Sequence, residues 1–307
     1  MSEYILKTNH ISKKYGNTVA LDDINISIKK GEIYGFIGQN GAGKSTMLRL
    51  VTGLAFPSSG SIELFGYDKP GVLTDAQKRM GAIIENPALF LNMSAYENLE
   101  VHRLQKGIPG KDCISSTLDI VGLPDTGRKK VKDFSLGMKQ RLGLAISLLS
   151  DPEFLILDEP TNGLDPMGIV ELRELIKKLN REKGITFFIS SHILSELHQL
   201  ATYYGIIHEG KLLEEMSAKT LDEKCKKHLR IKVDRPAKGA TVLEIALSTV
   251  NFEVMPDGTI KLYDFLDHVR KVSSVLTDNG LVIEHLSQNG DSLESYFSRL
   301  VGGVGHA

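Results

Sequence analysis

The chain has 307 residues, 41% of them hydrophobic, and its 37 Lys and Arg residues nearly balance its 38 Asp and Glu residues. This length and apolar content are typical of a globular protein with one large domain and one small domain. The balanced charge excludes a general attraction to nucleic acid or to an anionic membrane surface, so we expect no nucleic-acid partner.

Cysteine usage and the N-terminal segment indicate the compartment. The two cysteines, Cys113 and Cys225, lack C-x-x-C spacing, which fits a reducing compartment and argues against a disulfide framework or a zinc site. The first ten residues, MSEYILKTNH, lack a signal pattern, and no stretch approaches the about 18 apolar residues of a membrane-spanning helix. We therefore expect a cytoplasmic protein, and any membrane process it serves would need another chain to span the bilayer.

The first 30 residues predict antiparallel strands, with Gly16 and Gly31 as the turn residues. Apolar runs then recur up to about residue 218, and several are apolar at consecutive positions. The runs are 32–38, 81–85, 154–158, 185–190 and 203–208. Consecutive apolar positions are typical of strands covered on both faces, so we predict a largely parallel α/β sheet. Between residues 86 and 150 helical spacing dominates, which indicates an inserted helical subdomain.

The sequence changes character after residue 218. Strand-like segments begin near LRIKVD, NFEVMP, GTIKLY and LVIEHL, with helices expected near 240–248, 264–278 and 291–301. This order predicts a small α+β domain of the βαββαβα type over residues 219–307, after a main domain over 1–218. We find no catalytic motif in the small domain and expect a docking or regulatory role.

A phosphate-binding loop is predicted over GQNGAGKST, residues 38–46, which fits G-x-x-x-x-G-K-[ST]. An apolar strand precedes the loop and a helix follows it, as the motif requires, so a glycine-rich turn without a ligand is the weaker interpretation. Backbone N–H groups and the helix N-terminus would bind phosphate, Lys44 would reach the β- and γ-phosphates, and the Ser45 hydroxyl would bind Mg²⁺. The predicted nucleotide-binding loop residues are Gly38, Asn40, Gly41, Gly43, Lys44, Ser45 and Thr46.

Two acids end the apolar segment FLILDEP, residues 154–160. Ligands of open α/β sheets lie at the carboxyl ends of the strands, so Asp158 is predicted to hold Mg²⁺ beside the phosphate loop. Glu159 is the candidate general base that orients and deprotonates the attacking water. A solvated strand end is the common alternative for two adjacent acids, but together with a phosphate loop they predict ATP hydrolysis.

The segment FSLGMKQRLGLAISLLS, residues 134–150, resembles the signature motif of ATP-binding-cassette (ABC) ATPases. Relative to that family's L-S-G-G-Q, Ser135 and Gly137 are in place, whereas Phe134 replaces Leu and Leu136 replaces the first Gly. Other family elements follow in order: Tyr15 resembles the aromatic residue that stacks on adenine, NGLDP (162–166) resembles the loop after the acids, and His192 resembles the histidine that contacts the γ-phosphate.

This resemblance implies a P-loop NTPase fold of the ABC type, with ATP and Mg²⁺ as ligands. In the family two cassettes close head to tail, and each ATP lies between the phosphate loop of one and the signature serine of the other. The resemblance therefore implies a second cassette as partner, in a homodimer or a heterodimer. It also places Glu85, in GAIIENPALF (81–90), where a side-chain oxygen ligates Mg²⁺ or touches the attacking water. A solvated strand end is the alternative for Glu85.

A phosphate loop followed by two acids is compatible with three classes of function: a transporter subunit, a soluble ABC ATPase and a P-loop kinase. A transporter subunit is favoured by apolar residues after the 81–85 strand, which could receive a helix of a membrane partner, although they could equally be subdomain core. These residues are Leu89, Phe90, Leu91, Met93 and Tyr96. A soluble ABC ATPase acting on ribosomes or DNA resembles tandem cassettes or carries long insertions, which this sequence lacks. A P-loop kinase would need an acceptor-binding lid in place of the signature.

The segments GAIIENPALF and SLGMKQR and the additional C-terminal domain resemble the bacitracin- and lantibiotic-resistance exporters, which carry Glu where most ABC proteins carry Gln. We therefore expect the ATPase subunit of an antimicrobial-peptide exporter, bound to integral membrane permease subunits at the inner face of the cell membrane. The ATPase of another ABC exporter, with a different cargo, stays open as an alternative.

Overall fold

The computed structural model of the protein describes residues 3–290 and 293–302. The chain divides into two compact units, Met1–Ala218 and Lys219–Ala307. Each unit contains a hydrophobic core of its own. The two units are therefore described separately.

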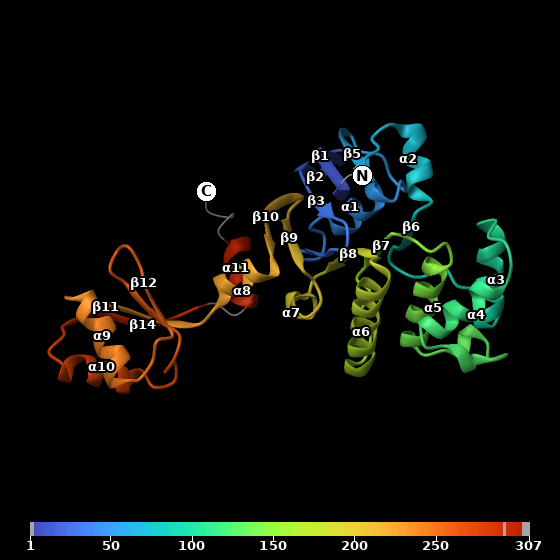
Figure 1. Ribbon diagram of the computed structural model, residues 1–307. Helices are drawn as coiled ribbons and strands as arrows, with labels where there is room; N and C mark the ends of the chain where they lie inside the picture. The colour runs from blue at the N-terminus through green and yellow to red at the C-terminus, as the bar shows by residue number, and fades with distance from the viewer. Residues whose placement is uncertain (1–2, 291–292, 303–307) are drawn as a thin grey trace. The chain divides into compact units, whose positions relative to one another are not determined.

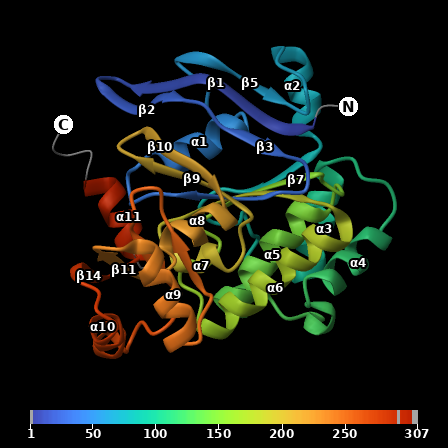
Figure 2. The same cartoon turned by 60° about the vertical axis from the view of Figure 1, so that its left-hand side comes forward.

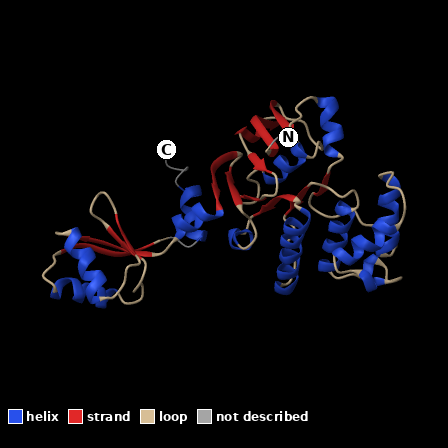
Figure 3. Ribbon diagram, viewed as in Figure 1, coloured by secondary structure: helices blue, strands red, loops and turns tan. Residues whose placement is uncertain are grey.

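A six-stranded sheet forms the centre of the first unit, in the order β10-β9-β4-β8-β7-β6 (Figure 3). All neighbours from β9 to β6 are parallel, and β10 pairs antiparallel with β9 at one edge. The strands are β4 (Ile33–Ile37), β6 (Met80–Ile83), β7 (Phe154–Asp158), β8 (Thr186–Ser191), β9 (Tyr203–His208) and β10 (Lys211–Ser217). The largely parallel α/β sheet predicted from the apolar runs is confirmed, although β6 ends before Glu85.

The N-terminal strands form a second, antiparallel sheet in which β1 pairs with β2, β3 and β5. These strands are β1 (Tyr4–Tyr15), β2 (Thr18–Ile24), β3 (Ser27–Lys29) and β5 (Ser59–Leu64). Gly16, with φ of 56°, lies in the turn between β1 and β2, as its position in the sequence predicted. β5 was not assigned from the sequence, because half of its residues are exposed and it lacks an apolar run.

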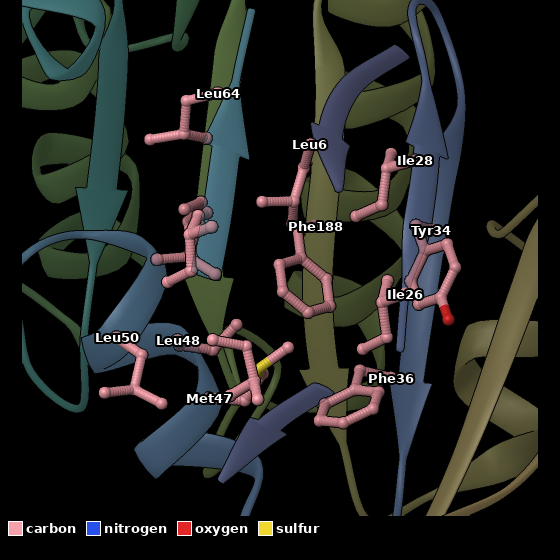
Figure 4. Close-up of a cluster of buried hydrophobic side chains, with 14 of the residues drawn as sticks. Leu6, Ile26, Ile28, Tyr34, Phe36, Met47, Leu48, Leu50, Leu64 and Phe188 are labelled. Carbon is pink, nitrogen blue, oxygen red and sulfur yellow. The ribbon is translucent and has the colours of Figure 1, made fainter. Parts of the chain in front are cut away.

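The main core lies between the two sheets and is filled by helix α1 (Lys44–Val51) (Figure 4). Met47 and Leu48 of α1 share this core with Ile26, which lies between β2 and β3, and with Phe36 and Phe188 from the parallel sheet. Lys44 and Ser45 at the start of this helix are thereby held against the carboxyl ends of the parallel strands. The helix ends at Val51, and Thr52 is its C-cap.

Three helices pack together beyond the β6 edge of the sheet, as predicted for residues 86–150 (Figure 1). They are α3 (Ala95–Gln105), α4 (Asp112–Ile120) and α5 (Leu136–Leu148), with short 3₁₀ turns η1 (Pro124–Thr126) and η2 (Val131–Asp133) before α5. Ser94 starts α3 with a capping box, in which its side chain accepts from Glu97 N–H while the Glu97 carboxylate accepts from Ser94 N–H. The remaining helices of this unit are α2 (Pro70–Gln77), α6 (Pro166–Lys183) and α7 (Leu194–His198), which Figure 2 shows from a second direction.

The second unit is a four-stranded antiparallel sheet in the order β12-β13-β11-β14. Its core joins alternate residues of β11, such as Leu229 and Ile231, to Val242 and Leu243 of α9 and to Leu276 of α10. The elements are α8 (Ala218–Cys225), β11 (His228–Val233), α9 (Pro236–Ala246), β12 (Phe252–Val254), β13 (Ile260–Leu262), α10 (Val269–Asp278), β14 (Ile283–Asn289) and α11 (Leu293–Gly302). From β11 onward this is the predicted βαββαβα order. The start predicted for the last helix, at 291, lies outside the described residues.

None of the helices found within residues 3–290 and 293–302 combines the length and the apolar character needed to cross a membrane.

Candidate functional site

The loop between β4 and α1 is shaped to approach a ligand closely with its backbone. Gly43 is the N-cap of α1 with φ of 111°, and a Cβ added there would lie 2.7 Å from the Ala20 carbonyl oxygen. A Cβ on Gly38 would lie 2.5 Å from the Ile207 carbonyl oxygen. Both positions therefore require glycine. No side chain caps the N-terminus of α1, so its first N–H groups and its positive dipole end are available to an anion.

Lys44, the first residue of α1, is only 5% exposed and points back into the loop. Its Nζ donates to the carbonyl oxygens of Gly38 at 2.8 Å and Gln39 at 3.2 Å, and it lies 3.1 Å from Oε1 of Glu159. Asn40 and Gly41 are exposed at the tip of the loop, while Ser45 and Thr46 are half-buried. The predicted loop residues thus surround one site, with a buried cation at its base.

Asp158 and Glu159 lie where β7 ends, next to β8. The buried Asp158 accepts a 2.6 Å hydrogen bond from the Ser190 hydroxyl, and Ser190 Oγ also accepts from Glu159 N–H at 3.0 Å. Glu159 has a left-handed φ of 49°, which turns its side chain away from the strand direction. Its Oε2 lies 2.6 Å from Nδ1 of His192, and its Oε1 contacts Lys44. The structure therefore brings Lys44, Glu159 and His192 together, with Asp158 linked through Ser190.

A second contact joins the same two segments behind this cluster. Thr161 lies two residues after Glu159, and its hydroxyl donates to Oε2 of Glu196 in α7 at 2.5 Å. The segment 159–161 is therefore tied twice to the segment 192–196, through Glu159 with His192 and through Thr161 with Glu196. The sequence did not single out Ser190, Thr161 or Glu196, because their roles depend on partners about 31 to 35 positions away along the chain.

Glu85 lies outside this cluster. It follows the end of β6 with a left-handed φ of 63°, and its Oε1 lies 2.5 Å from a guanidinium nitrogen of Arg49 in α1. In the described part of the chain no hydrogen bond or ion pair links Glu85 to Asp158 or Glu159, and no group of three or more Asp, Glu, His or Cys side chains is placed to hold a metal. In this structure Glu85 is thus paired with a cation of α1 and is not joined to the two acids after β7.

The signature segment forms a separate surface. Ser135 is the N-cap of α5 and accepts from Met138 N–H, and Gly137 lies in the first turn. Both line a groove of about 740 Å³ together with the loop 163–168 and Arg141. The side chain of Leu136, which replaces a family glycine, would meet a Cβ on Gly163 at 2.9 Å, so it lies directly on this loop. No hydrogen bond or ion pair among the described residues joins this surface to Lys44 or Glu159.

Tyr15, the last residue of β1, is 48% exposed, and the Lys13 ammonium lies 4.9 Å from its ring centre. Its ring is available to a planar ligand, and within residues 3–290 and 293–302 no hydrogen bond, ion pair or ring contact joins it to the phosphate loop. The predicted site residues therefore fall into a central cluster, the Arg49–Glu85 pair, the signature groove and Tyr15.

Comparisons with known proteins identify the family. The family model described as "ABC transporter" matches residues 21–162. The bacitracin transport ATP-binding protein BcrA of Enterococcus faecalis is 42% identical over 305 residues, which cover 99% of this chain and 99% of that protein. This match necessarily includes the second unit.

A further relative and a solved structure each match 69% of this chain. The lantibiotic transport ATP-binding protein SrtF of Streptococcus pyogenes is 49% identical over 211 residues, covering 69% of this chain and 90% of SrtF. The dimeric post-hydrolysis structure of the ATP-binding cassette MJ0796, bound to ADP and Pi, has a TM-score of 0.63 at 25% identity and covers 69% of this chain and 98% of that one. The chain belongs to the ATP-binding subunits of ABC transporters and is an ATPase of that family.

Proposed function

We propose that this protein hydrolyses ATP to drive a membrane exporter of antimicrobial peptides of the bacitracin or lantibiotic type. The observation that supports this class of cargo is the likeness to a bacitracin transport protein over nearly the whole chain, including the second unit. The likeness to a lantibiotic transport protein over 211 residues supports the same class of cargo.

In this proposal the central cluster performs the hydrolysis. Lys44 and the loop N–H groups bind the phosphates, Tyr15 stacks on adenine, and Glu159 orients and deprotonates the attacking water. His192, which contacts Glu159, holds that carboxylate and reaches the γ-phosphate.

The residues present fit Mg²⁺, although they do not form a cage of protein ligands. Mg²⁺ keeps several waters and is held by one or two carboxylates together with substrate phosphates. Ser45 and Asp158 offer a hydroxyl and a buried carboxylate beside the phosphate loop, and Glu85 offers a third oxygen ligand on a separate segment. When bound, the metal would neutralise phosphate charge.

The signature groove would receive the ATP of a second cassette, so that Ser135 and Gly137 complete the partner's site. The groove is open and its polar lining includes Arg141, Asp165 and Glu171, which suits a polar partner surface. Dimerisation is described for the MJ0796 cassette, and we extend it here to either a second copy of this chain or a related cassette.

The membrane permease would dock on the apolar residues between the end of β6 and the first turn of α3. Phe90, Leu91 and Tyr96 are exposed, while Leu89 and Met93 are half-buried. Buried Asn98 fixes the loop, because its side chain accepts from Phe90 N–H at 2.8 Å and donates to the Phe90 carbonyl at 3.1 Å. A permease helix on this surface would hold the protein at the inner face of the cell membrane.

Peptide susceptibility of the native host tests the proposal. Deletion of the gene should lower the inhibitory concentration of bacitracin or of a lantibiotic, and the wild-type gene should restore it. Lys44→Ala should fail to restore resistance, whereas Arg79→Gln, which removes an ion pair with Glu153 away from the site, should restore it. Unchanged susceptibility to both peptide classes after deletion would contradict the cargo. Copurification with a polytopic membrane protein separates a transporter subunit from a soluble ABC ATPase.

A further inference from the structure

The Arg49–Glu85 pair connects the nucleotide-binding helix to the start of the helical subdomain. Arg49 lies in α1, four positions after Ser45, so both side chains project from the same face of the helix. Glu85 faces this side of α1 and its carboxylate is bound by Arg49 at 2.5 Å. The Glu85 carboxylate thus contacts a cation that lies about one helical turn from the residue proposed to hold the metal.

We propose that Arg49 is a positioning residue that competes with the metal for Glu85. This inference rests on the proposed Mg²⁺ role of Ser45 and Glu85. In the structure described here Arg49 holds the carboxylate, and metal binding with ATP transfers it from the guanidinium to the metal. The pair is therefore the released position of a switch, and the metal-bound carboxylate is the engaged position.

The pair has the properties that such an exchange requires. The side chains of Arg49 and Glu85 are 40% and 59% exposed, so water screens their attraction and the pair is readily broken. A glutamine in place of Glu85 could still offer an oxygen to the metal but would lack the charge that Arg49 attracts. The competition therefore follows from the acid at this position.

A displacement of Glu85 would reach α5 through direct packing. Two residues after Glu85, the Pro87 ring lies so close to Gly143 of α5 that a Cβ on Gly143 would come within 2.5 Å of the Pro87 Cβ. Ser135 is the N-cap of α5, and it lines the signature groove together with the first turn of that helix. Because interiors this tightly packed transmit shifts, transfer of Glu85 would move α5 and with it the surface proposed to meet the partner's ATP.

The test is the Mg²⁺ dependence of nucleotide binding, measured by the fluorescence of a labelled ATP analogue over a range of Mg²⁺ concentrations. Arg49→Gln should lower the Mg²⁺ concentration for half-maximal binding by about two- to fivefold, the range expected when one exposed competing ion pair is released. In the Glu85→Gln background the same Arg49→Gln substitution should have no effect, because no charged pair remains to be broken.

Arg79→Gln is the matched control. Its ion pair with Glu153 has similar exposure, 39% and 49%, and it should leave the Mg²⁺ dependence unchanged. An Arg49→Gln protein with the wild-type Mg²⁺ dependence, or a shift of equal size in the Glu85→Gln background, would overturn the competition while leaving the proposed function intact. Nucleotide binding by the wild type that ignores Mg²⁺ would instead remove the metal site on which the inference rests.

Discussion

Nζ of Lys44 lies 3.1 Å from Oε1 of Glu159, which joins the start of α1 to the end of β7. The Lys44 side chain is only 5% exposed and that of Glu159 is 20% exposed. A charge as deeply buried as that of Lys44 is costly without a partner, so Glu159 supplies the negative charge that a phosphate would otherwise bring. We expect nucleotide binding to replace this pair, which would free Glu159 to orient water.

Glu159→Gln should leave ATP binding intact but lower turnover by about 10²-fold or more, because it removes the base while keeping a hydrogen-bonding side chain. Steady-state phosphate release and nucleotide titration check the two parts. Glu153→Gln, an exposed carboxylate paired with Arg79, is the control and should match the wild type. Normal turnover by Glu159→Gln would contradict its role as the base.

Lys44→Ala should weaken nucleotide binding by about 2 kcal/mol, roughly 30-fold, since the phosphates lose a charged donor. Equilibrium titration with a labelled ATP analogue measures this. The melting temperature of the variant should also be measured without nucleotide, to show that it is folded. This control is needed because Lys44 donates to two loop carbonyls, and its loss alters the free loop. An unchanged ATP affinity in a folded variant would count against the phosphate-loop assignment.

Ser135→Arg should abolish ATP-driven dimerisation while leaving a monomer that binds nucleotide, because the signature serine is proposed to meet the partner's ATP. Gel filtration with ATP in the Glu159→Gln background checks this, since slow hydrolysis traps the closed dimer. Ser116→Arg, on the exposed side of α4, serves as the matched control. A persistent ATP-dependent dimer in Ser135→Arg would refute the composite site.

Thr161→Val and Glu196→Gln should each lower kcat by about tenfold with little change in KM, because their hydrogen bond helps to hold the Glu159 segment beside His192. The double variant should be little worse than either single variant, since both remove the same contact. Thr277→Val, in the second unit, is the control for loss of a threonine hydroxyl. Additive losses, or losses confined to thermal stability, would contradict a positioning role.

Glu215→Gln should raise the thermal stability of the first unit at neutral pH. Burial raises the pKa of Glu215, and nearby Glu32 raises it further, although hydrogen bonds from Tyr34 and from the Ser27 backbone lower it. Because the folded-state pKa lies above the ordinary 4.5, ionisation opposes folding, and stability from this group is lost as the pH rises through the folded pKa.

The glutamine keeps the acceptor for the 2.6 Å hydrogen bond from the Tyr34 hydroxyl but cannot ionise. The difference in melting temperature between Glu215→Gln and the wild type should therefore be a gain at pH 7 to 8 and should shrink towards pH 4. Glu182→Gln, at an exposed position of α6, is the control. A difference that does not depend on pH would show that ionisation of Glu215 is not its cause.

Local sequence patterns sufficed for much of the fold. The strands β4, β7, β8 and β9 were predictable because both of their faces are buried, which leaves runs of consecutive apolar residues. Strand β10 and helix α8 were not assigned, because most of their side chains are partly exposed and their polar residues obscure any period. Strand β11 of the second unit was predictable because buried and exposed residues alternate along most of it, which gives a period of two in the sequence.

The sequence by itself determined the chemistry available to the site, since the phosphate loop and the acids after β7 are contiguous motifs whose residue types and spacing carry their own physical meaning. The tertiary structure decided which of those groups touch. In the fold Glu159 contacts Lys44 and His192, and Glu85 forms an ion pair with Arg49. These partners lie between about 33 and 115 positions apart, and contacts over such separations are set by strand order and helix packing, which no local pattern encodes.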